Sequence, residues 1–112
     1  KPPEEAVAER AQERLDLLIA QDYEAAYEYL SPGYRSGVTL NDYQRRMLRQ
    51  RMQWTDATVT QSDCSEDACK VRISMAYAVY GAVPGVSRFD SKAVSTEDWV
   101  RSSGQWYFIP SN

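Results

Sequence analysis

The sequence predicts a single α+β domain in which helices cover one face of an antiparallel sheet. A chain of 112 residues is the size of one domain. Apolar residues repeat at the helical period of 3.6 up to about residue 54, and at the two-residue period of strands after it. Helices followed by strands are typical of the α+β class. We expect one domain over residues 1–112, with an ordered core from about residue 4 to residue 110.

The first half predicts three helices. The first starts at Glu4, with acidic residues in the turn where the helix dipole favours negative charge. The second opens at Asp22, a typical N-cap, and should end at the Ser31–Gly33 turn, with a loop after it. The third opens at Thr39 and should stop near Trp54. Residues spaced to form their buried stripes are Val7, Ala11, Leu15, Leu18 and Ile19, then Tyr23, Ala26, Tyr27 and Leu30, then Leu40, Tyr43, Met47 and Met52.

The second half predicts four strands. The clearest alternation places one set of side chains on a single face, which we expect to meet the helices: Val71, Ile73, Met75, Tyr77 and Val79. The glycines and proline of Gly81–Ser87 predict a long connection. A third strand is expected from about Arg88 to Arg101, and Ser102–Gly104 predicts a tight turn into a last strand.

The two cysteines, Cys64 and Cys69, flank a polar four-residue connection, Ser65–Ala68, between two strand patterns. This arrangement predicts a β-hairpin with the cysteines facing each other at a distance that a disulfide can bridge. With two cysteines and no histidine, we expect no metal site and no cofactor. The spacing differs from the C-x-x-C of redox enzymes. Two free thiols in a cytosolic protein remain the alternative. A disulfide would favour a periplasmic or secreted protein.

The net charge of −3 gives no basic surface for nucleic acid, so we expect no nucleic-acid partner. No apolar run approaches the roughly 20 residues that span a bilayer. The chain starts at Lys1, so an export signal is not present to be read. We expect membrane contact only through a lipid anchor outside this chain.

The segments DYEAAYEYLSPGYR and EDWVRSSGQWYFIP resemble the nuclear transport factor 2-like superfamily. The second is the more telling, with an acidic pair, Trp99, a turn at Gly104 and then Trp106 in an aromatic strand. The resemblance covers about Glu4 to Pro110. It implies a cone, with three N-terminal helices packed in the concavity of a bent, mostly antiparallel four-stranded sheet. Members include isomerases, dehydratases, cyclases and domains without catalysis, so the fold specifies no reaction.

Within such a cone, we expect five side chains to line a pocket for a small apolar ligand: Tyr27, Tyr43, Met75, Tyr77 and Trp99. A buried tyrosine more often packs its ring in the core. No strand pattern places a lone carboxylate among apolar neighbours, although strand alternation could turn Asp56 or Asp98 inward. We therefore predict no catalytic residue.

The helix segment Gln44–Met52 carries four arginines, Arg45, Arg46, Arg49 and Arg51. This basic stripe could hold an anionic ligand or an acidic partner. More often such a stripe is a solvated helix face.

The leading hypothesis is a non-catalytic exported domain that binds a small apolar ligand or a protein partner. An isomerase, cyclase or dehydratase with a carboxylate base in the cone is one alternative. A structural dimerisation module is another, since Ala76 and Ala78 could permit two sheets to pack closely in a homodimer.

Overall fold

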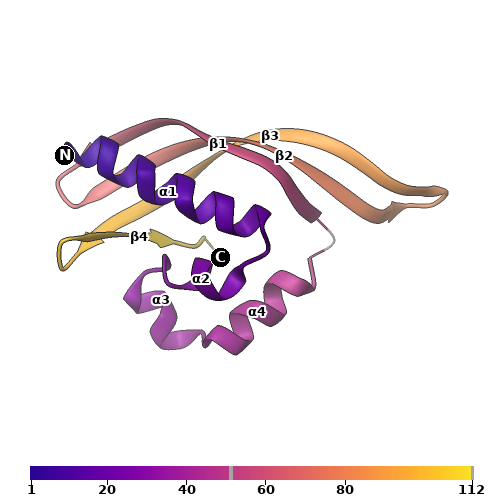
Figure 1. Ribbon diagram of the computed structural model, residues 1–112, viewed down its shortest axis with the longest axis horizontal. Helices are drawn as coiled ribbons and strands as arrows, with labels where there is room; N and C mark the ends of the chain where they lie inside the picture. Colours follow the sequence, from indigo (N-terminus) through magenta and orange to yellow (C-terminus); the bar gives the residue numbers. More distant parts are fainter. Residues whose placement is uncertain (51, 112) are drawn as a thin grey trace.

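The computed structural model describes residues 1–50 and 52–111, and it folds into four helices and one sheet (Figure 1). The helices are α1 (Pro3–Ile19), α2 (Tyr23–Tyr27), α3 (Pro32–Gly37) and α4 (Leu40–Leu48). The strands are β1 (Met52–Ser65), β2 (Ala68–Val83), β3 (Val86–Ser102) and β4 (Gln105–Ile109). The sheet order is β1-β2-β3-β4, and each strand runs antiparallel to the next. This is the predicted α+β class.

Helix α1 lies along one face of the sheet, and the three short helices lie beyond it, around the short strand β4 (Figure 1). The predicted stripe of α1 packs on the sheet, with Val7, Ala11 and Leu15 fully buried. Gln12 fixes the helix to β1, because its amide donates to the carbonyl of Ala57 and its side-chain oxygen accepts from the amide of Val59. The concave side of the sheet therefore faces α1.

The short helices begin at side-chain caps. Asp22 and Thr39 accept hydrogen bonds from the amides three residues on, as predicted. The prediction of a loop after Ser31–Gly33 was wrong. Ser31 caps α3 by accepting from the Tyr34 amide, and Pro32 occupies the first helical turn, where its missing N–H costs nothing. The first half thus has four helices, and α4 ends at Leu48 instead of near Trp54, which lies in β1.

Both long hairpins turn more tightly than predicted. Cys64 pairs with Cys69 and Ser65 with Ala68, so only Glu66 and Asp67 form the first turn. The predicted long connection at Gly81–Ser87 is mostly strand, because β2 and β3 pair out to Val83 and Val86. Gly85, at φ +80°, lies in the turn that joins them. The result is an arm of β2 and β3 that extends past the helices (Figure 1).

The predicted inner face of β2 is correct over its first half. Val71, Ile73 and Met75 are buried in the core, but Tyr77 and Val79 are only half-buried. The arm carries this end of β2 away from the helices that would cover it. Ala78, on the opposite face, is fully buried.

Candidate functional site

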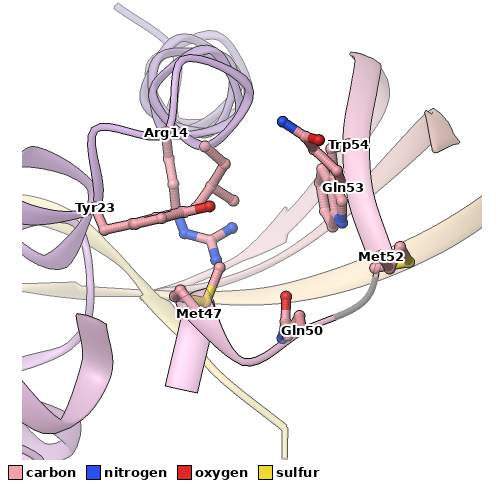
Figure 2. A pocket seen from close by; sticks show the side chains of 8 residues that line it. Arg14, Tyr23, Met47, Gln50, Met52, Gln53 and Trp54 are labelled. Atoms are coloured by element: carbon pink, nitrogen blue, oxygen red, sulfur yellow. The ribbon is translucent and has the colours of Figure 1, made fainter. Parts of the chain in front are cut away.

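A cavity of about 170 Å³ opens where the C-terminal ends of α1 and α4 approach the start of β1. Its walls combine apolar and polar side chains: Arg14, Leu18, Tyr23, Met47, Gln50, Met52, Gln53 and Trp54. Figure 2 shows the Arg14 side chain projecting from α1 into this space, between Tyr23 on one side and Trp54 on the other.

Arg14 forms a buried ion pair with Glu97 of β3. The Arg14 Nη1 atom lies 2.8 Å from the Glu97 Oε2 atom, and each side chain is 8% exposed. The Trp99 indole N–H donates to the other carboxylate oxygen at 3.0 Å, and the guanidinium lies 3.9 Å from the centre of the Phe108 ring. Partners on both sides compensate the cost of removing two charges from water.

A second cavity, of about 200 Å³, adjoins the first and shares Arg14 and Trp54 with it. Met75, Glu97 and Phe108 contribute to its lining. The ion pair therefore lies where the two cavities meet, and the cone is not fully closed by its own side chains.

Two buried polar atoms of the described residues lack a hydrogen-bond partner, Arg14 Nε and the Tyr43 hydroxyl oxygen. Burial raises the pKa of Tyr43 above its usual value, and the nearby positive charge of Arg14 opposes that shift only in part. The phenol thus keeps its proton at neutral pH. The Arg14 guanidinium lies beside the Tyr43 hydroxyl, and its Nε atom has no surface open to the cavity.

The five side chains predicted to line a pocket do not form one group. Tyr27 and Tyr43 pack together, with ring centres 5.6 Å apart, and the Tyr27 hydroxyl donates to the Val38 carbonyl at 2.6 Å. Met75 lines the second cavity. Trp99 is buried in the core, and Tyr77 is half-buried opposite Trp54 in the strand pair.

The acidic residues singled out in the sequence face solvent. Asp56 is exposed, and Asp98 is exposed and paired with Lys70 across the strands. The sequence predicted no lone carboxylate among apolar neighbours on a strand, and it did not single out Glu97, which is a buried strand carboxylate, 7% exposed. It is not alone there, because Arg14 is its partner. Glu97 lies opposite Val71 in the pairing of β2 with β3. Because Val71 was predicted to face inward, the same pattern could have identified Glu97 as a buried residue.

The arginines of α4 lie on an exposed helix face. Arg45 pairs with Asp42, Arg46 donates to the Tyr34 hydroxyl, and Arg49 is exposed at the helix end. Arg51 lies outside the described residues. These contacts fit the solvated-face interpretation of the basic stripe.

A hollow of about 500 Å³ lies at the hairpin end of the sheet, and much of its lining comes from the outer face, which includes Lys70, Asp98 and Ile109. It is larger than the cone cavities, and two of the charged residues that line it, Lys70 and Asp98, already pair with each other. The cone cavity, whose walls include the buried Arg14 side chain, is therefore the better candidate site.

The solved structures with a similar fold include a protein from Streptomyces avermitilis and one from Rhodopseudomonas palustris. A proposed dehydratase of the NTF2-like family from Streptomyces avermitilis aligns with a TM-score of 0.66 at 14% identity, covering 96% of each chain. A SEC-C motif-containing protein from Rhodopseudomonas palustris aligns with a TM-score of 0.68 at 14% identity, covering 90% of this chain and 73% of that one.

No protein-family model matches the sequence, and no curated protein matches it either. Among the described residues, no helix has both the length and the apolar character needed to cross a membrane. At 14% identity, the structural matches speak for the fold alone. The chain has the nuclear transport factor 2-like fold.

Proposed function

We propose that this domain is a non-catalytic binding module that holds a small, mostly apolar molecule in the cone. The observation that carries the proposal is the cavity of about 170 Å³ whose walls include Leu18, Met47 and Trp54. An apolar cavity of about 150 Å³ holds a molecule the size of benzene. The ligand of this cavity is thus about the size of one ring.

The test is calorimetric titration with single-ring compounds such as toluene and ethylbenzene. We expect binding by the unmodified protein and at least a tenfold loss in Leu18→Trp, which fills the cavity from α1. Leu48→Trp is the matched control, because Leu48 is 73% exposed and lines neither cone cavity. Equal affinities for the unmodified protein and Leu18→Trp would contradict the proposal.

A second candidate is an isomerase, cyclase or dehydratase, and Glu97 favours it. Glu97 is a buried carboxylate that lines the second cavity, so a substrate there would meet a potential base. Against this, its oxygens already accept from Arg14 and Trp99. A base held by two donors is a poor proton acceptor, so the binding role is preferred.

Turnover assays separate these two functions. Steroid and polyketide-like substrates would be tested with the unmodified protein and with Glu97→Gln. The binding proposal predicts no turnover by either protein. Turnover that Glu97→Gln lowers by orders of magnitude would establish the enzyme instead.

Export is the remaining part of the proposal. The Cys64–Cys69 disulfide supports a periplasmic or secreted protein, because such bonds persist in oxidising compartments. A protein partner and a structural dimerisation role remain alternatives to the small ligand. They would be favoured if no small molecule bound.

A further inference from the structure

Strand β3 has an open edge along the arm. It pairs with β2 from Val86 to Val100, but with β4 only from Asp98 onward. Among the described residues, no strand pairs with the side of β3 away from β2 between Val86 and Glu97, and we call this side the open edge. The arm lies beyond the helices, and residues 81–90 are all exposed (Figure 1). A free edge of this length can accept a further strand.

The other edge of the sheet, at β1, is closed in part by α1. Gln12 bonds to the carbonyl of Ala57 and to the amide of Val59, which are backbone groups that an added strand would use. The open edge of β3 lies on the arm, away from α1 (Figure 1). A strand from outside the molecule would therefore add at β3.

Charged side chains alternate in sign along the open edge. Arg88, Asp90 and Lys92 are two residues apart, so they share one face of β3. The Arg88 Nη2 atom lies 2.8 Å from the Asp90 Oδ1 atom, whereas Lys92 is exposed and has no ion-pair partner among the described residues. Charges on an edge strand usually keep other strands away. Charges of alternating sign, however, attract a strand that carries the matching alternation.

We propose that the open edge of β3 pairs with the same edge of a second copy of this chain, antiparallel, about a twofold axis at Ser91. A twofold axis perpendicular to the sheet makes the two edges antiparallel and keeps both inner faces on one side. Residues of the same face then lie opposite each other: Ser91 opposite its own copy, Asp90 opposite Lys92, and Arg88 opposite Val94. The inference goes beyond the proposed function and does not depend on it.

The charges select this register. With Ser91 on the axis, each Asp90 meets Lys92 of the other copy, so Lys92 gains the partner that it lacks. Moving the axis by one residue sets Asp90 against Asp90 or Lys92 against Lys92, and like charges directly opposite repel. An axis at Phe89 would pair Arg88 with Asp90, but these two already pair within one chain and Lys92 would stay alone.

The same register covers apolar side chains that one copy leaves exposed. Phe89 is 40% exposed and Val94 is 69% exposed. Phe89 would lie opposite Ala93 of the second copy, whose small side chain leaves room for the ring. Val94 would lie opposite Arg88, whose methylene groups can cover it while the guanidinium stays in water. Backbone hydrogen bonds would thus give affinity, and the side chains would give the register.

Cysteine cross-linking tests the position of the axis. Facing residues of an antiparallel pair have Cα atoms roughly 4.5–5.5 Å apart, which a disulfide can bridge. Under mild oxidation we expect Ser91→Cys to give at least tenfold more covalent dimer than Ser95→Cys. Ser95 is the matched control, because it shares the inner face of β3 but would lie opposite Ser87.

The cross-link also separates this contact from packing of two outer faces. Ser91 pairs with Tyr77, so it lies on the inner face of the sheet. Two copies packed by their outer faces would hold these inner positions apart, and Ser91→Cys would then form no covalent dimer.

A charge exchange tests the ion pairs. Lys92→Asp sets two carboxylates opposite each other at both ends of the symmetric pair, so it should raise the Kd of the dimer at least tenfold in sedimentation velocity. The double variant Asp90→Lys/Lys92→Asp restores opposite signs across the axis and should return the Kd to within about threefold of the unmodified value. Circular dichroism melts would confirm that both variants fold.

Three outcomes would overturn the inference. The first is equal cross-linking of Ser91→Cys and Ser95→Cys. The second is a double variant that associates as weakly as Lys92→Asp, because charges paired in another register would not be restored. The third is a monomer at all concentrations of the unmodified protein. None of the three affects the cavity ligand, which calorimetry tests separately.

Discussion

Tyr43 carries a hydroxyl group that the fold buries without a hydrogen-bond partner. The residue is 5% exposed, and its ring packs against Tyr27. The ring therefore contributes packing, while the hydroxyl has lost its water and has only the neighbouring Arg14 guanidinium in its place, without a well-formed hydrogen bond. The raised pKa of Tyr43 follows from the same burial, because the phenolate would be less stable still.

Removing this hydroxyl should stabilise the protein. We expect Tyr43→Phe to raise the free energy of unfolding by about 0.5–1 kcal/mol at pH 8, since the unsatisfied group is lost and the ring is kept. Urea denaturation measures this change. Tyr80→Phe, at a position 40% exposed, is the control and should change stability little.

The same variant should change how the free energy of unfolding depends on pH above about pH 10. A tyrosine with a raised pKa in the folded state contributes stability below its ordinary pKa of 10.0, and this is lost as pH rises above that value. Stability of the unmodified protein should fall more steeply above pH 10 than that of Tyr43→Phe. If the stability of the two proteins fell in parallel with pH, the raised pKa of Tyr43 in the folded state would be contradicted.

Arg14 and Glu97 explain why the site was only partly predictable from sequence. Arg14 follows Val7 by seven residues and Ala11 by three, so it lies on the apolar stripe of α1. Helical periodicity alone treats an arginine there as a side chain whose charge reaches solvent. Its true partner is 83 residues away, and only the register of β2 and β3 brings the two together.

At the scale of single elements, the capping residues and the cysteines were better predictors of structure than the glycines and prolines were. The caps at Asp22 and Thr39 and the hairpin at the cysteines were correct. Ser31–Gly33 was misinterpreted because serine and proline favour a helix start as well as a turn. Gly81–Ser87 was misinterpreted because only two residues are needed to turn a long hairpin.

The β1–β2 hairpin should be closed by a disulfide in the isolated protein. Cys64 and Cys69 are bonded in the structure, with Cα atoms 4.0 Å apart. Thiol titration of denatured, unreduced protein should find no free thiol. Reduction should cost about 2 kcal/mol or less, because the closed loop is short. Two free thiols would remove the disulfide and the main support for export.

At the scale of the whole molecule, the sheet has one covered face and one open face. Helix α1 covers the concave side, whereas Val94 and Ile109 lie exposed on the outer side, at 69% and 38%. Near the core, the alternation of apolar residues along β2 predicted which face of the sheet the helices cover. It could not predict how far the arm extends beyond the helices, because that depends on their packing.

Self-association through the outer face stays a prediction. We expect sedimentation velocity to detect a dimer that Val94→Lys converts to monomer, because a lysine would have to be desolvated between the two sheets. Leu48→Lys is the control, because Leu48 is exposed to a similar degree, at 73%, but lies on α4. A monomer at all concentrations of the unmodified protein would exclude this interface.

The β1-β2-β3-β4 strand order has a consequence for how fast the chain reaches its fold. Each strand pairs with its neighbour in sequence, so the sheet can form by successive hairpins, and contacts of short sequence separation favour rapid folding. The Arg14–Glu97 pair joins residues 83 apart and can form only after α1 docks on that sheet. Glu97→Gln should therefore accelerate unfolding while leaving the refolding rate almost unchanged, which stopped-flow kinetics in urea would measure. Slower refolding of the variant would mean that α1 is already in place at the rate-limiting step.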